Sequence, residues 1–262
     1  MSETIDKTEA ELFCTDLDVE IEKRIADGYR LLMIKPADDP SEAVMLKDSS
    51  QIRVRTGEKI RSATSEWTIG RAGMMYRDLI PDRLGGRVIA SHIRITKGGP
   101  VADKVHYHKI DFQVIYCLKG AIKVVYEDQG EPFWLQPGDC VLQPPEIRHR
   151  VLEAEAGSEV IEITSPAEHE TWFDHEMQLP NAVVNPDRTF GGQPFVLHTT
   201  TDSEWKSSAF DGIMASDTKI SGVRTLKMTG DSKNRIKITQ ETSPELLILI
   251  DGTGIVANLG KF

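Results

Sequence analysis

Residues 98–120 read GGPVADKVHYHKIDFQVIYCLKG, and the fold prediction starts from this stretch. It contains two runs that are typical of β-strands, KVHYHK and FQVIYCL, with Ile110 and Asp111 free to form the bend between them. His106 and His108 lie two positions apart in the first run. Because side chains alternate between the two faces of a strand, both imidazoles are expected to point the same way. Two imidazoles on one face have the geometry of a bidentate metal ligand.

The strand pattern continues on both sides of this stretch. Between Gly73 and Thr164 the strand-like runs are MMYRDL, RVIASHIRI, KVHYHK, FQVIYCL, AIKVVYE, PFWLQ, DCVLQ, IRHRVL and EVIEIT, and no long helical period interrupts them. Lys119-Gly120 predicts a two-residue hairpin, and Pro137-Gly138 predicts a type II turn. Many short strands without intervening helices favour a sandwich or small closed barrel over a doubly wound sheet. We predict one antiparallel β-barrel.

Two further side chains are candidates for the same metal site. Gln113 lies at the start of the run after the two histidines, and His149 lies on a later run that returns after GDCVLQPPEIR. In a closed barrel these side chains can face one interior point, where three imidazoles and one amide oxygen suit Zn, Fe, Mn or Ni. Alternation from Gln113 and His149 also places Ile115, Cys117 and Val151 inward, as an apolar wall. The other four histidines, at positions 92, 169, 175 and 198, are interpreted as ordinary surface or core residues.

These segments resemble two motifs of the cupin superfamily. GGPVADKVHYHKIDFQVIYCLKG is similar to the first motif, and GDCVLQPPEIRHRVLE is similar to the second. The resemblance, to RmlC-like cupins, implies a double-stranded β-helix (jelly-roll) barrel that binds one divalent metal ion through His106, His108, Gln113 and His149. Position 113 is Gln here, where Glu is more frequent in the superfamily. The resemblance is strong over residues 70–168 and weak over the second half, as in bicupins with one degenerate barrel.

The rest of the chain predicts a division into four parts. These are an N-terminal arm with edge strands (1–64), the metal-binding barrel (65–168), a linker rich in Pro, Gly, Asn and charge (169–194), and a second β domain (195–262). The whole is expected to be all-β, with few short helices.

A faint internal repeat supports the second domain. Residues 67–120 and 205–252 share a Trp, an acidic turn and an apolar strand that ends in Gly, and the alignment places Gln113 opposite Glu245. His106 and His108 fall opposite Ile238 and Gln240, so the second copy has lost the histidines. We predict a degenerate, incomplete cupin-like domain that is completed by N-terminal strands near residues 30–55 or by a second subunit.

Composition excludes several classes of function. The chain has 262 residues, of which 39% are hydrophobic and 27% charged, and no apolar run is long enough to span a membrane. The formal net charge of −10 repels phosphate backbones, so we expect no nucleic acid partner. The N-terminus lacks a secretory signal, and the three cysteines form neither a CxxC pair nor a disulfide pattern, so a reduced, cytoplasmic protein is expected. The cupin resemblance implies a homodimer.

The proposed ligands indicate chemistry on a small molecule. Because the Gln113 amide is neutral, the site keeps about two positive charges and should attract anionic oxygen ligands. Four protein ligands leave one or two metal positions open for water or substrate. Because neutral imidazole is the binding form, metal affinity is expected to fall as the pH drops through about 6.5.

The sequence is compatible with three functions. The first is a metal-dependent enzyme that acts on a small oxygen-rich or anionic organic molecule, as a dioxygenase or as a lyase or isomerase. A His, His, Gln, His set resembles cupins that act on unsaturated uronates, which favours the lyase or isomerase reaction. The second is a non-catalytic, metal-containing cupin that binds a small molecule. The third, a structural bicupin with a vestigial metal, is disfavoured because the ligand set is intact.

Overall fold

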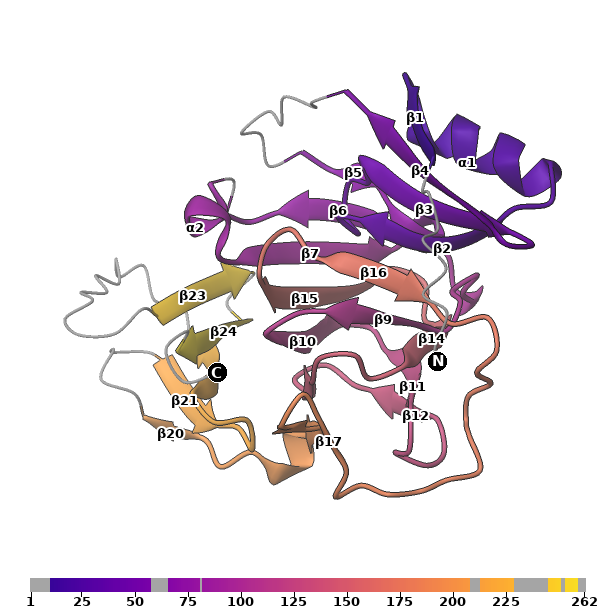
Figure 1. The fold of residues 1–262 in the computed structure, drawn as a ribbon. Helices are drawn as coiled ribbons and strands as arrows, with labels where there is room; N and C mark the ends of the chain where they lie inside the picture. Colours follow the sequence, from indigo (N-terminus) through magenta and orange to yellow (C-terminus); the bar gives the residue numbers. More distant parts are fainter. Residues whose placement is uncertain are drawn as a thin grey trace.

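Two β-sheets face each other and enclose an apolar core, as in a jelly-roll barrel (Figure 1). The structure, a computed structural model, describes residues 10–57, 66–80, 82–207, 213–228, 245–250 and 253–258. Each of the nine runs predicted as strands between Gly73 and Thr164 contains a strand. The all-β, cupin-like jelly-roll fold expected from the sequence is therefore confirmed.

The strands of the barrel belong to two large sheets. The first is ten-stranded, in the order β1 (Ala10–Cys14), β4 (Ser50–Thr56), β3 (Glu42–Lys47), β2 (Arg30–Lys35), β16 (Glu170–Phe173), β9 (His106–Lys109), β14 (His149–Ala154), β11 (Ile122–Tyr126) and β12 (Phe133–Leu135), with β8 (Gly99–Pro100) paired to β14. The second is seven-stranded, in the order β19 (Val196–His198), β13 (Cys140–Gln143), β10 (Phe112–Lys119), β15 (Ser158–Ser165), β7 (Ile89–Ile95), β6 (Met75–Asp78) and β5 (Thr68–Ile69).

The remaining elements are smaller. They are a hairpin of β17 (Thr189–Phe190) and β18 (Gln193–Pro194), a five-stranded sheet in the order β20 (Lys206–Ser207), β21 (Ile213–Asp217), β22 (Val223–Met228), β24 (Thr253–Asn258) and β23 (Glu245–Ile250), and the helices α1 (Leu17–Ala26) and α2 (Arg83–Gly86). Among the described residues no helix is long and apolar enough to cross a bilayer.

Strand alternation divides the apolar side chains between the two faces of the second sheet. On β10, Cys117 is buried in the core between the sheets, and Ile115 packs against that core. Their neighbours Val114 and Tyr116 belong to a different core on the outer face of the same sheet. Val151 on β14 also packs against the inner core. The side chains predicted to face inward therefore do so.

The chain crosses from one sheet to the other at Lys119-Gly120, so the predicted two-residue hairpin is wrong. β10 pairs with β13 and β15, whereas β11 pairs with β12 and β14. A local turn signal reports only that the chain reverses, and it does not say which strand becomes the partner. At Pro137-Gly138 the type II turn is confirmed, because Gly138 has φ +95° and the Asp139 amide donates to the Gln136 carbonyl at 2.9 Å.

The N-terminal strands extend the first sheet of the barrel. β2 pairs with β16, and α1 covers β2, β3 and β4 with Leu17 and Ile21. The Asp16 side chain caps α1 by accepting a hydrogen bond from the Val19 amide at 3.1 Å. The expectation that residues 30–55 complete the C-terminal domain is therefore wrong, since a strand's partner is set by packing that the local sequence does not specify.

The C-terminal five-stranded sheet lies against the outer face of the barrel. Ile220 and Val223 join the outer core formed by Val114, Tyr116 and other residues of the second sheet. β19, which the sequence assigned to the C-terminal domain, pairs instead with β13 of the barrel. Positions 238 and 240 of the predicted repeat lie outside the described residues, as do parts of the N-terminal arm, so the degenerate cupin-like domain stays a prediction.

Candidate metal centre

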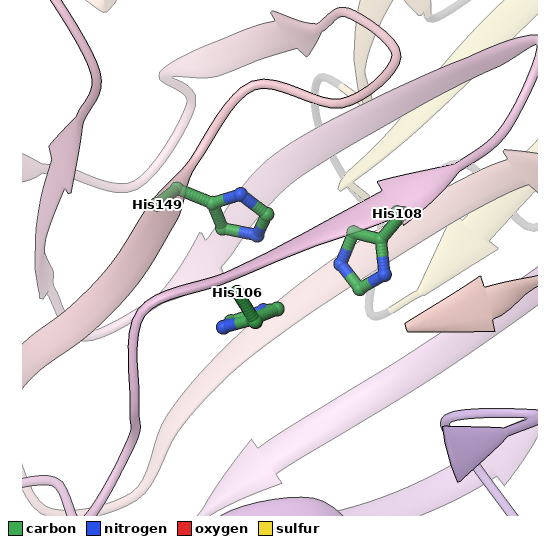
Figure 2. Close-up of side chains that lie close together, drawn as sticks. All are labelled: His106, His108 and His149. Atoms are coloured by element: carbon green, nitrogen blue, oxygen red, sulfur yellow. The ribbon is translucent and has the colours of Figure 1, made fainter. Parts of the chain in front are cut away.

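Three imidazoles meet inside the barrel. His149 on β14 lies directly opposite His106 on β9, and His108 follows two positions along β9, on the same face. The ring centroids are 4.2 Å apart for His106 and His149, 5.0 Å for His106 and His108, and 5.1 Å for His108 and His149. Figure 2 shows the three rings gathered around one space, and one nitrogen from each lies within 4.8 Å of the others. The three histidines predicted as ligands are therefore brought together.

The second nitrogen of each ring is held by the protein. The Nδ1 atom of His106 lies 2.7 Å from the Lys104 carbonyl oxygen, and that of His149 lies 2.9 Å from the Ile147 carbonyl oxygen. Because a carbonyl only accepts, Nδ1 carries the proton in both rings, and Nε2 carries the lone pair. For His108, the Nδ1 atom is 2.9 Å from the Thr171 hydroxyl. Such contacts orient imidazole ligands and fix their tautomer.

One nitrogen of each ring is placed to bind a metal ion. The His106 Nε2 atom is buried and has no hydrogen-bond partner among the described residues. A buried acceptor without a partner costs about 1–3 kcal/mol, and a divalent cation would remove that cost by taking the lone pair. Imidazole nitrogen is a good ligand for Zn, Fe and Ni. The residues present therefore fit a divalent metal ion bound by His106, His108 and His149.

Burial keeps all three imidazoles neutral. It lowers the pKa of His106 and of His108 well below the usual value, and it lowers the pKa of His149 to about 4. The Arg71 charge adds to the lowering of the His106 pKa. The loss of metal affinity that was expected near pH 6.5 should therefore occur at lower pH. The sequence did not predict this shift, because it does not reveal how deeply these rings are buried.

Gln113 lies across the barrel from the histidines, on β10. Its Nε2 donates to the Thr164 hydroxyl at 3.0 Å, and its Oε1 accepts a hydrogen bond from the Gln143 amide. The Gln143 Nε2 atom is also 3.1 Å from the Nε2 atom of His149. Gln143 therefore links Gln113 to the three-histidine cluster, and Gln113 as the fourth ligand stays a prediction.

Several residues of the centre were missed at the sequence level. Gln143 lies opposite Gln113 in the register of β13 and β10, and Thr171 lies opposite His108 in the register of β16 and β9. Thr171 falls in the segment interpreted as a linker, although residues 170–173 form a strand. No local signal identifies such residues, since their role depends on which distant strand lies beside them.

A buried ion pair flanks the centre. The Asp103 carboxylate pairs with Arg71, and one of its oxygens is 3.7 Å from the His106 Nδ1 atom. Its other oxygen accepts a hydrogen bond from the Val151 amide at 2.9 Å. On the opposite sheet, burial raises the pKa of Glu162 to about 7, although the Arg71 charge opposes that shift. The centre therefore combines neutral imidazoles with a fixed cation and with a carboxyl group that exchanges its proton near neutral pH.

Comparison with known proteins identifies the type of domain. Residues 91–164 match the family described as "Cupin domain", so this part of the chain is a cupin domain. No curated protein matches the chain.

Three solved structures illustrate the likeness. KdgF from Halomonas sp. is 24% identical, with 38% of this chain and 87% of that chain covered and a TM-score of 0.33. A mutant of Bacillus subtilis oxalate decarboxylase OxdC is 13% identical, with 65% and 58% covered and a TM-score of 0.43, so the chain spans little more than half the length of that protein. The polyketide cyclase RemF from Streptomyces resistomycificus is 19% identical, with 47% and 88% covered and a TM-score of 0.37.

Proposed function

We propose that this cupin domain is the catalytic part of a metal-dependent enzyme that acts on a small oxygen-rich or anionic organic molecule. His106, His108 and His149 hold the divalent ion in this proposal, with Gln113 as the fourth ligand. The observation that carries it is the buried His106 Nε2 atom, which has no partner among the residues that the structure describes and lies beside two other imidazoles. The Nδ1 atoms of all three rings are engaged. A structural role needs no free lone pair at the centre of a polar cluster.

The chain's own residues define what such a centre can do. When bound, a divalent metal supplies Lewis-acid polarisation of a substrate oxygen. The Lys104 and Ile147 carbonyls and the Thr171 hydroxyl hold the imidazoles in place, so little reorganisation is needed during a reaction. Because the three imidazoles and the Gln113 amide are neutral, they leave the metal charge uncompensated, which favours an anionic substrate. The reaction class in this proposal is that of a dioxygenase or of a lyase or isomerase.

A second candidate function is a non-catalytic cupin that binds a small molecule through its metal. It is favoured by the low exposure of the histidines, which are 0%, 4% and 6% exposed at positions 106, 108 and 149. A buried metal centre suits tight retention of a ligand as well as turnover.

One experiment separates the two candidates. The full chain is purified, its bound metals are measured by mass spectrometry, and dioxygen uptake is followed with small catechols and diketones while uronates are tested for lyase or isomerase products. About one metal per chain with turnover on one of these classes supports the enzyme. Metal without turnover on any class supports the binding protein, and a chain that retains no metal after loading overturns both.

A further inference from the structure

A cavity of about 390 Å³ lies between the N-terminal helix and the barrel. Its apolar wall includes Ile21 of α1, Ile34 of β2 and Phe173 of β16, and Arg71 and Lys104 supply positive charge. This volume is within the range of pockets that hold small organic ligands. The cavity is therefore large enough for a small acid with several carbon atoms.

The cavity lies beside the metal centre. Phe173, which lines it, is directly opposite His106 in the pairing of β16 and β9, and the two ring centroids are 6.3 Å apart. Directly opposite residues on paired strands share a face, so Phe173 and the histidines are on the same side of the first sheet. Asp103 also lines the cavity, and its carboxylate is 3.7 Å from the His106 Nδ1 atom.

Arg71 presents unused hydrogen-bond donors at this place. Its side chain is 12% exposed, and one Nη atom pairs with Asp103, which is itself 1% exposed. A guanidinium group has five N–H donors, and the buried Arg71 Nε atom has no partner among the described residues. Asp103 is also occupied by the Val151 and Lys104 amides. The ion pair therefore neutralises Asp103 but leaves donors of Arg71 available.

We propose that this cavity is a carboxylate-binding subsite, in which the Arg71 guanidinium holds the carboxylate of a small organic acid. A guanidinium matches the planar geometry of a carboxylate and binds it with charge-assisted hydrogen bonds. Asp18 and Glu22 of α1 also line the cavity, and their negative charge disfavours a multiply charged group such as a phosphate ester. The inference names small organic acids as the substrate class of the proposed enzyme, and in that respect it rests on the proposed function.

The test is a calorimetric titration of the full, metal-loaded chain with malonate, succinate and glutarate, and with malonamide as a neutral comparison. Arg71→Lys keeps a positive charge beside Asp103, so it tests the guanidinium without leaving a buried carboxylate unpaired. We expect the best of the three acids to bind about tenfold or more weakly to Arg71→Lys, because bidentate charge-assisted bonds are lost. Malonamide should not bind. Metal content should equal that of the wild type, which shows that the centre is intact.

Arg94→Lys is the matched control. Arg94 also pairs with a carboxylate, that of Glu159, through its Nε atom at 3.1 Å, but it lines neither the cavity nor the metal centre. This variant should bind the acids as the wild type does. Equal acid affinity in the wild type and in Arg71→Lys overturns the subsite, and so does the absence of acid binding to the metal-loaded wild type.

Titration of chelator-treated protein separates this inference from the proposed function. Acid binding that depends on Arg71 and persists without metal supports the subsite even if the chain fails to retain metal. Acid binding that needs the metal but not Arg71 overturns the subsite and leaves the metal centre standing.

Discussion

His92 and the three histidines of the metal centre are all buried, but their ring nitrogens are used in opposite ways. His92 lies on the outer face of the second sheet and is 2% exposed. Its Nε2 atom is 2.6 Å from a Glu159 carboxylate oxygen, and its Nδ1 atom is 2.9 Å from an Arg77 Nη atom. In the centre, by contrast, each Nδ1 atom has a neutral partner, and the His106 Nε2 atom has none in the part of the chain that the structure describes.

The difference shows that burial alone does not identify a ligand. A histidine whose two nitrogens are satisfied by an anion and a cation has no lone pair to offer, so His92 holds β6, β7 and β15 together. A histidine with one nitrogen held by a hydrogen bond and a lone pair on the other can bind a metal ion. His169 lies between the two cases, because its ring is 5.3 Å from that of His108 and its buried Nε2 atom has no partner among the described residues.

The difference between His92 and the histidines of the centre is tested most directly by removing one histidine of each kind. In His106→Ala, metal affinity should fall by more than about 100-fold, because loss of a ligand exceeds the effect of losing a residue that only orients one. In His92→Ala, metal content should stay as in the wild type, while the free energy of unfolding falls by about 3 kcal/mol because Glu159 and Arg77 each lose a buried hydrogen-bond partner. Mass spectrometry of bound metal and urea unfolding provide the two measurements. Equal loss of metal in both variants would contradict the distinction.

Acid should destabilise the metal-free protein through the histidines of the centre. The pKa of His149 is about 4 in the folded chain, below the usual value of about 6.5 in an unfolded chain. Between these values the unfolded state binds more protons, so stability is complete above about pH 6.5 and falls as the pH drops toward 4. His149 alone accounts for roughly 3 kcal/mol of this loss.

Urea unfolding at about pH 7.5 and about pH 4.5 measures the effect. His149→Gln should lose less stability on acidification than the wild type, since it lacks one of the buried neutral rings. His92→Gln should lose nearly as much as the wild type, because Glu159 offsets part of the burial effect on the His92 pKa. A His92 variant that removes most of the acid sensitivity would show that the centre is not its source.

Removing the hydroxyl group that orients His108 should have a smaller effect. Thr171→Val keeps the shape of the side chain but removes the hydroxyl that lies 2.9 Å from the Nδ1 atom. Metal affinity should fall by about 10–100-fold, the usual effect of losing such a contact. Thr225→Val is the control, since Thr225 is 1% exposed and its hydroxyl donates to the Ser216 carbonyl in the C-terminal sheet. Competition with a chromogenic chelator reports both affinities, and similar losses in the two variants would refute a specific role for Thr171.

The smallest effect is expected from a substitution that adds a negative charge to the centre, whose proposed ligands are all neutral. Gln113→Glu can still accept the hydrogen bond from Gln143, so the metal should be retained. The added negative charge should weaken the binding of anionic ligands by about tenfold, and it should leave a neutral ligand such as imidazole unaffected. Equal or tighter anion binding, measured by calorimetry, would count against the electrostatic argument.

Much of the fold and part of the metal centre could be predicted from the sequence, because these features depend on residues that are neighbours in the chain. The alternation of apolar residues located the strands between Gly73 and Thr164, and the two-residue spacing of His106 and His108 placed both rings on one face. The turn at Pro137-Gly138 was predictable because the residues themselves set the backbone angles. The path of the chain at Lys119-Gly120 could not be predicted, since the same turn residues also occur where a chain passes from one sheet to the other.

The sequence by itself determined which residues between Gly73 and Thr164 form strands, which side chains share a face, and that three histidines could converge in a closed barrel. Only the tertiary structure decided that Thr171 and Gln143 lie beside them, that Arg71 and Asp103 flank His106, and that His92 is satisfied while His106 is not. The physical reason is that side-chain direction repeats every two residues along a strand, whereas the partner across a strand pair comes from a distant segment chosen by the packing of the whole barrel.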